Sequence, residues 1–252
     1  GIGRAFCLAL ARRGGRVLVA DVNLPAAEET ASMVRAAGGQ AHVVKCDVSS
    51  KDDVYALPGV MKERFGGTDL VFNNAGVAVG GPVHEIPVSD WEWLMGINLW
   101  GVIYGTKALL PMMLARSEGC IVNISSVFGM VSFPAQGAYN ISKFGVRGLT
   151  ECLWNELDGT GVRAICVHPG GIRTNIEKAG RRCAAAGEEE ARFSALADKL
   201  LLTSPDECAA DIIAGIERGR KRIITGNRST TLFWLSRLLP NSYPAVLKRI
   251  AG

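Results

Sequence analysis

The stretch CIVNISSVFGMVSFPAQGAYNISKFGV, residues 120–146, combines a strand pattern, a loop and the start of a helix. Its apolar run at 120–125 predicts a buried strand that ends at Ser126. The segment that carries Tyr139 predicts a helix that continues to about residue 158. Strand and helix alternate in this way along the chain, which predicts an α/β fold: a doubly wound parallel sheet with helices on both faces, in a single domain.

The remaining predicted elements follow the same alternation. A first helix begins near Ile2 and is ended by Gly14 and Gly15. Further strands are predicted at 17–20, 41–46, 69–72, 162–168 and 222–225. Further helices are predicted at 25–37, 51–65, 89–116 (interrupted or bent near Gly101 and Pro111) and 206–218. The polar segment 175–203 is expected to be helical and mobile.

Tyr139 and Lys143 are the pair in this sequence with the clearest chemistry. Residues four apart on a helix share a face, with Cβ atoms within about 6 Å of each other. A nearby ammonium group favours the phenolate, and a tyrosine with an ordinary pKa of about 10 needs such a neighbour to act as a base. With the hydroxyl of Ser126 as a donor to a carbonyl oxygen, the three predict proton exchange at a carbonyl or alcohol. The alternative is a solvated surface pair.

The start of the chain, Gly1-Ile2-Gly3, resembles the end of a glycine-rich turn that leads into a helix. A dinucleotide site needs a strand before such a turn, and we expect this strand and the start of the turn to be missing. Asp21 follows the strand at 17–20, where a carboxylate accepts hydrogen bonds from the adenosine ribose. The alternative for Asp21 is an ordinary loop acid after a strand.

Other polar residues follow predicted strands or interrupt apolar segments. Ligands bind beyond the carboxyl ends of strands in open α/β sheets, which makes Asp47 and Asn74 candidates. Asp47 is alternatively a helix cap, and Asn74 alternatively forms a turn. Asn98, within an apolar helix segment, is either a satisfied structural amide or a residue that bends the helix and holds a water.

Composition excludes several classes of protein. The 252 residues carry a net charge of +4 that is spread along the chain, so nucleic acid is not an expected partner. The seven cysteines form no CxxC pair, which favours buried thiols in the reducing cytoplasm. The three histidines have no metal-ligand spacing, so no metal is expected. No apolar run reaches the ~18 residues that a membrane span requires.

Taken together, these motifs resemble those of the short-chain dehydrogenase/reductase family, a family with a Rossmann-type sheet. The matching residues are Gly1-Ile2-Gly3, Asp21, Asp47, NNAG (73–76), Asn98 in INLWG, Ser126 in NISSVFG, YNISK (139–143) and PGGIRT (169–174). The resemblance covers residues 1–226, and an apolar, basic tail follows at 227–252. Family members begin with a strand and a Thr-Gly-x-x-x turn before the GIG, so the chain is expected to be a fragment.

The resemblance implies hydride transfer between a nicotinamide cofactor and a secondary alcohol or carbonyl compound. Tyr139 is then the general acid/base, Lys143 lowers the pKa of the phenol and binds the nicotinamide ribose, Ser126 polarises the substrate oxygen, and Asn98 holds a water that relays protons. The implied cofactor contacts are Gly1, Ile2, Gly3, Asp21, Asp47, Val48, Asn74, Tyr139, Lys143, Ile172 and Thr174. Asp21 favours NAD over NADP because it repels a 2′-phosphate, although Arg4 could offset part of this repulsion.

The sequence also allows alternative functions and predicts a substrate class and an assembly. The chain is alternatively a catalytically silent dinucleotide-binding or scaffold protein. A sugar epimerase or dehydratase fits less well, because such enzymes carry a sizeable extra domain. An apolar small-molecule substrate is expected between 77–86, 127–136 and 175–203. The resemblance also implies a homodimer or homotetramer, and the tail either packs over the substrate site or a subunit, or lies on a membrane.

Overall fold

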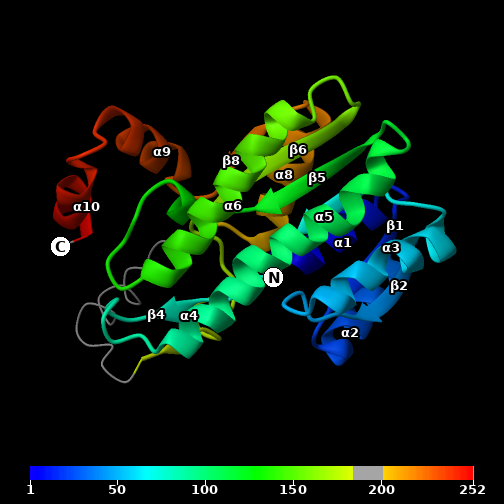
Figure 1. The fold of residues 1–252 in the computed structure, drawn as a ribbon, viewed down its shortest axis with the longest axis horizontal. Coiled ribbons are helices and arrows are strands. Elements are labelled where there is room, and N and C mark those ends of the chain that lie inside the picture. Colours follow the sequence, from blue (N-terminus) through cyan, green and yellow to red (C-terminus); the bar gives the residue numbers. More distant parts are fainter. Residues whose placement is uncertain (184–200, 252) are drawn as a thin grey trace.

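The computed structural model describes residues 1–183 and 201–251, with parallel strands between two layers of helices (Figure 1). The main strands are β1 Arg16–Asp21, β2 Gln40–Lys45, β3 Leu70–Asn73, β5 Gly119–Ile124, β6 Val162–Pro169 and β8 Arg222–Thr225. The helices are α1 Ile2–Ala11, α2 Leu24–Ala36, α3 Lys51–Phe65, α4 Val88–Met95, α5 Gly101–Leu114, α6 Gly137–Glu156, α8 Pro205–Glu217, α9 Ser229–Leu238 and α10 Tyr243–Ala251.

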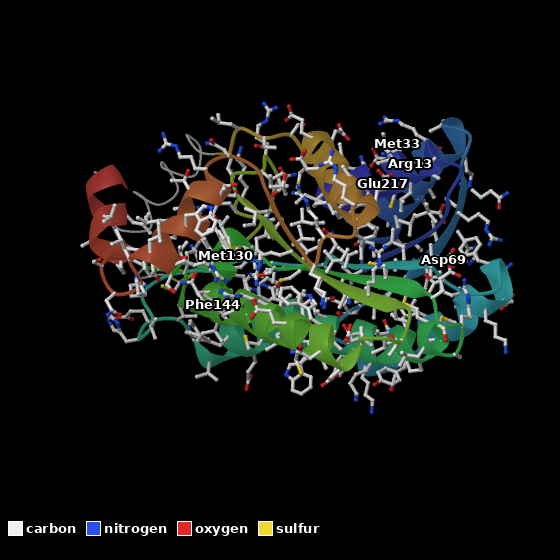
Figure 2. All side chains as sticks on the ribbon, turned by 90° about the horizontal axis from the view of Figure 1, so that it is seen from above. Arg13, Met33, Asp69, Met130, Phe144 and Glu217 are labelled. Carbon is white, nitrogen blue, oxygen red and sulfur yellow. The ribbon has the colours of Figure 1, made fainter. Side chains whose placement is uncertain are left out.

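The helices cover both faces of the sheet, as the alternating pattern predicts. Helices α1, α2 and α8 lie on one face, and α3, α5 and α6 lie on the other (Figure 2). An ion pair joins the turn after α1 to the end of α8, with Arg13 Nε 3.2 Å from Glu217 Oε1 (Figure 2). The prediction of a doubly wound, Rossmann-type α/β domain is therefore confirmed.

The main strands form two hydrogen-bonded groups rather than one continuous sheet. Strand β1 pairs with β2, and the second group has the order β3-β5-β6-β8; every pairing is parallel. No described strand pairs with the second edge of β1 or of β3. The division lies between the strand that carries Asp21 and the strand that leads to Asn74.

The core explains why β5 reads as a continuous apolar run. Val122 belongs to a cluster with residues of α1, β6 and α8, whereas its neighbour Ile121 belongs to a cluster with residues of α5 and α6. Successive side chains of a strand point to opposite faces, and both faces are covered here. Both residues are fully buried.

Two predicted segments differ in detail from the structure. The helix predicted at 89–116 is divided into α4 and α5 by one π-helical turn, Gly96–Trp100, which contains Asn98. The segment predicted at 175–203 contributes a short strand, β7 Arg181–Arg182, which pairs with β4 Val79–Gly80. Residues 184–200 of that segment lie outside the described part of the chain.

The C-terminal tail packs on the loop before α6. The hydroxyl of Tyr243 in α10 accepts a hydrogen bond from the backbone N–H of Ser132 at 3.1 Å. This contact favours the packing interpretation of the tail, yet Trp234 and Leu238 on α9 remain exposed. Within the described residues, no helix has the length and hydropathy required to cross a bilayer.

Candidate active site

Lys143 and Asn98 converge at the end of β3, beside Tyr139. A methyl group placed on Gly76 would lie 3.4 Å from Asn98 Oδ1 and 3.5 Å from Lys143 Nζ, so the loop backbone at Gly76 lies beside both polar groups. Lys143 Nζ lies 5.6 Å from the centre of the Tyr139 ring and donates a hydrogen bond to the carbonyl of Ile124 at 3.0 Å. The site is therefore formed by one face of α6, the loop after β3 and the π-helical turn Gly96–Trp100.

Asn98 is a satisfied amide. Its Oδ1 accepts from the backbone N–H of Val77 at 2.8 Å, and its Nδ2 donates to the carbonyl of Val77 at 2.9 Å and to Ser142 Oγ at 3.2 Å. These bonds fix the loop that follows β3 against α6. Asn98 is therefore hydrogen-bonded as a structural amide would be, and its role in a water relay remains a prediction.

The electrostatics of Tyr139 and Lys143 differ from the expectation. Burial raises the pKa of Tyr139 to about 12; the hydroxyl of Ser126 opposes this rise and the charge of Glu177 adds to it. Burial lowers the pKa of Lys143 to about 8. The expected lowering of the phenol pKa by Lys143 is thus not found in this arrangement, because desolvation favours the neutral form of both groups.

The three segments that were predicted to line the substrate site do meet. Gly81 N–H donates to the carbonyl of Ala135 at 2.9 Å, and β4 pairs with β7. Phe128 stacks on Phe133 with ring centres 4.8 Å apart and meets the ring of Tyr139 edge-on at 5.9 Å. Two stacked phenylalanine rings therefore lie beside the phenol ring of Tyr139.

The first turn of α1 lies beside Asn74 and Thr174. A methyl group on Gly3 would lie 2.9 Å from Asn74 Nδ2, and one on Gly1 would lie 4.0 Å from Thr174 Cγ2. The first N–H groups of a helix have no partner within it and attract anions. Gly1 and Gly3 at this helix start therefore lie close to Thr174 and Asn74, and their contacts with a cofactor remain a prediction.

Asp21 and Arg4 occupy the neighbouring surface. Asp21 is exposed at the end of β1, and its Oδ1 accepts the N–H of Asn23 at 2.9 Å. Arg4 donates to both carboxylate oxygens of Glu29, at 3.0 and 2.6 Å, and to Thr30 Oγ1 at 3.1 Å. The arginine that could offset Asp21 is therefore bound to another carboxylate.

Three other predicted contacts have structural roles. Asp47 Oδ1 accepts from the N–H and hydroxyl of Ser49 at 2.9 and 2.7 Å, whereas the cap of α3 is Ser50. A methyl group on Gly101 would lie 2.9 Å from a Val48 side-chain carbon, so Val48 packs against the start of α5. The side chain of Ile172 is buried in the core cluster, which leaves its backbone for any cofactor contact.

The sequence did not single out His168 as a functional residue. His168 is fully buried, and its Nδ1 lies 3.0 Å from the carbonyl oxygen of Ser126. Its partners are separated from it by 42 residues or more, so no motif could have identified them. Among the described residues, no three potential metal-ligating side chains are grouped to hold an ion.

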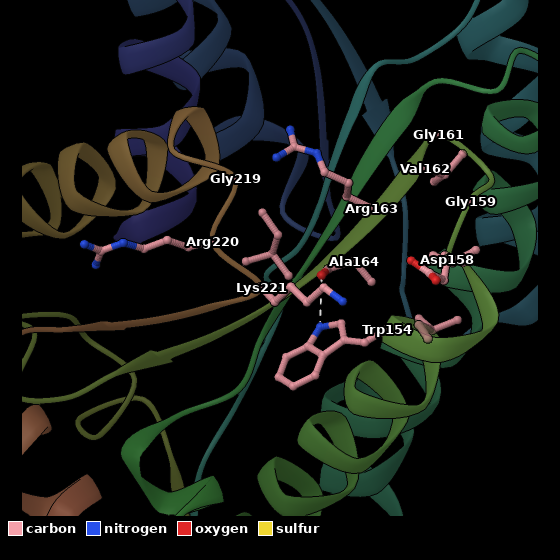
Figure 3. Close-up of a pocket in the computed structure, with 13 residues that line it drawn as sticks. Trp154, Asp158, Gly159, Gly161, Val162, Arg163, Ala164, Gly219, Arg220 and Lys221 are labelled. Carbon is pink, nitrogen blue, oxygen red and sulfur yellow. Dashed lines mark hydrogen bonds between the residues drawn. The ribbon is translucent and has the colours of Figure 1, made fainter.

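A separate cavity lies at the other end of β6, away from Tyr139. It has a volume of about 300 Å³ and is lined by Trp154, Val162 and Arg163 among others (Figure 3). Its position at the amino end of the strand sets it apart from the site described above, because ligands of open α/β sheets bind beyond the carboxyl ends.

Comparisons with known proteins agree with this geometry. A family model described as short chain dehydrogenase matches residues 1–184. The Mycobacterium tuberculosis protein named as an oxidoreductase, SadH, is 37% identical over 246 residues, which cover 96% of this chain and 88% of the relative.

Solved structures give the same result. A short chain dehydrogenase/reductase from Burkholderia phymatum in complex with NAD is 34% identical, with a TM-score of 0.83 over 89% of this chain and 84% of that chain. A short-chain dehydrogenase from Streptomyces avermitilis is 25% identical, with a TM-score of 0.85 over 100% of this chain and 94% of that chain.

Proposed function

The chain belongs to the short-chain dehydrogenase/reductase family, and we propose that it transfers a hydride between NAD(H) and a secondary alcohol or carbonyl compound. The observation that carries this proposal is the meeting of Tyr139, Lys143 and Ser126 at the carboxyl end of the sheet. The glycine-lined start of α1 supports a dinucleotide next to it. When bound, the nicotinamide supplies or accepts the hydride.

Tyr139 acts as the proton donor in the direction of carbonyl reduction. With a pKa near 12 it keeps its proton at neutral pH, and its hydroxyl donates to the substrate oxygen as negative charge develops there. The hydroxyl of Ser126 is a second donor to that oxygen. Fixed donors of this kind stabilise the transition state because they need little reorganisation.

Lys143 supplies the positive charge of the site. Because its pKa is about 8, it is only partly protonated at a pH near 8. We assign it the nicotinamide ribose as partner, since an added acceptor would favour its charged form and, through it, the phenolate of Tyr139. Asn98 fixes the neighbouring loop and holds the water that links Lys143 to solvent.

NAD is the preferred cofactor in this proposal. The carboxylate of Asp21 is exposed and accepts hydrogen bonds from a ribose with a free 2′-hydroxyl. Arg4, the basic residue closest in sequence to the glycine turn, is engaged by Glu29. A 2′-phosphate would therefore meet the negative charge of Asp21, while Arg4 is already paired with Glu29.

The substrate is an apolar molecule and the assembly is a homo-oligomer. Phe128 and Phe133 offer an apolar surface beside Tyr139. Trp100, Ile141 and Phe144 are exposed on the outer helices, at 50%, 53% and 38%, and pairing of two copies would cover them. The free cysteines support a reducing, cytoplasmic location.

The test is turnover by the purified protein with NAD(H) and a panel of steroid, acyl and short-chain alcohols and ketones. Formation or loss of NADH absorbance on addition of substrate supports the proposal. Cofactor binding without turnover on any member of the panel would favour the alternative, a catalytically silent dinucleotide-binding protein.

A further inference from the structure

A line of polar side chains leads from α6 to the backbone of Ser126. His168 Nδ1 lies 3.0 Å from the Ser126 carbonyl oxygen, and Arg222 Nη1 lies 3.3 Å from His168 Nε2. Arg222 Nη2 in turn donates to Glu151 Oε1 at 2.6 Å. The line joins β6, β8 and α6 behind the candidate site.

The hydrogen positions in this line follow from the donor properties of arginine. A guanidinium group can only donate, so His168 Nε2 must accept and Nδ1 must carry the hydrogen. Burial lowers the pKa of His168 to about 4, and the charges of Arg222 and Arg147 contribute to this lowering. His168 is therefore a neutral, fixed donor to the Ser126 carbonyl near neutral pH.

A second arm starts from the same carboxylate. Arg147 Nε donates to Glu151 Oε1 at 2.7 Å, and Arg147 Nη1 donates to the carbonyl of Gly129 at 3.4 Å. Ser126 and Gly129 are the two ends of the short 3₁₀ turn after β5, where Gly129 N–H also donates to the Ser126 carbonyl at 2.9 Å. Glu151 thus supports both ends of the turn.

Glu151 and Arg222 are well suited to this support. Burial alone would raise the pKa of Glu151, but its hydrogen bonds from Arg147 and Arg222 outweigh it and hold the pKa below its ordinary value. The guanidinium of Arg222 lies 5.1 Å from the ring centre of Trp154. Trp154 is itself held by its indole N–H, which donates to the carbonyl of Ala164 at 3.0 Å (Figure 3).

We infer that His168, held by Arg222 and Glu151, is a positioning residue for the hydroxyl of Ser126. Ser126 Oγ accepts the N–H of Phe128 at 3.1 Å, within the turn, so the direction of its O–H follows the backbone of that turn. A donor displaced by about 1 Å can cost up to 10²-fold in rate. The inference rests on the proposed function, in which Ser126 donates to the substrate oxygen.

The test compares His168→Leu with His168→Asn, in the wild type and in a Ser126→Ala background. His168→Leu removes the donor, and we expect kcat to fall by about 10- to 100-fold with an unchanged Kd for NADH. The amide nitrogen of asparagine can occupy the place of Nδ1, so His168→Asn should recover most of kcat. In the Ser126→Ala background, His168→Leu should cause no further loss.

An equal loss of kcat from His168→Leu in both backgrounds would overturn the inference, because His168 would then act without Ser126. If Ser126→Ala itself leaves turnover unchanged, the proposed function fails first. Where His168→Leu does not fold, ¹⁵N NMR of wild-type His168 near neutral pH replaces it: a neutral ring with hydrogen on Nδ1 supports the inference, and hydrogen on Nε2 or a charged ring overturns it.

Discussion

The cofactor end and the catalytic end of this site are held by different kinds of interaction. Around α1, β1 and α2, exposed charges such as Asp21 and the Arg4–Glu29 pair lie at the surface. Around α6, Lys143 and His168 are buried and bonded to backbone carbonyls. Exposed pairs are screened by water and contribute little to stability, whereas buried groups depend strongly on their partners. Cofactor choice should therefore change at small cost, and catalytic geometry should not.

The largest effect is expected from Tyr139→Phe, which removes the hydroxyl and keeps the ring. Turnover should fall by at least ~10²-fold, the usual scale for loss of a general acid or base. NADH binding, measured by fluorescence titration, should persist because the cofactor end is untouched. Turnover close to that of the wild type would refute the assignment of Tyr139.

The pH dependence of stability tests the buried end directly. The pKa of His168 falls from 6.5 to about 4 on folding, so below pH 6.5 the unfolded chain binds a proton that the folded chain rejects. Stability should therefore decrease as pH falls, by about 2 kcal/mol between pH 6.5 and 5. The free energy of unfolding, determined by urea denaturation at pH 6.5 and at pH 5, measures this decrease.

His168→Asn is the control for this measurement, since it cannot titrate and the surrounding Arg147, Glu151 and Arg222 remain. The difference in pH dependence between the two proteins isolates His168 from other titrating groups. Equal slopes in both proteins would show that His168 is not buried in its neutral form.

At the cofactor end, Asp21→Ser should reduce the preference for NAD over NADP by about 10-fold. Loss of a charged hydrogen-bond acceptor is worth about 1.5–3 kcal/mol when the bond is well formed, and exposure places the effect at the lower limit. The ratio of kcat/KM for the two cofactors measures it. An unchanged ratio would remove Asp21 from cofactor selection.

The smallest effect is expected from Glu29→Gln, which weakens the hold on Arg4. This ion pair is exposed and screened by solvent, so kcat/KM with NADP should rise by only roughly 2- to 5-fold. Glu28→Gln, one residue away on α2, removes the same charge and is the matched control. An equal rise in both variants would indicate a general change of charge rather than release of Arg4.

The sequence by itself determined the layout of the fold and the identity of the chemical groups. Alternating apolar runs at 120–125 and 162–168 gave the parallel strands, because a strand covered on both faces needs apolar side chains throughout. The spacing of Tyr139 and Lys143 placed them on one helix face. Asp21 was predicted at a strand end from local pattern alone.

Only the tertiary structure decided how these groups are tuned and held. The pKa of Tyr139 is raised rather than lowered, because desolvation depends on what the fold packs around the ring. Asn98 is satisfied by Val77, 21 residues away in sequence, and His168 bonds to Ser126 across 42 residues. Arg222 reaches Glu151 across 71 residues. Hydrogen bonds act over about 3 Å in space, so partners this distant in sequence have no local signature.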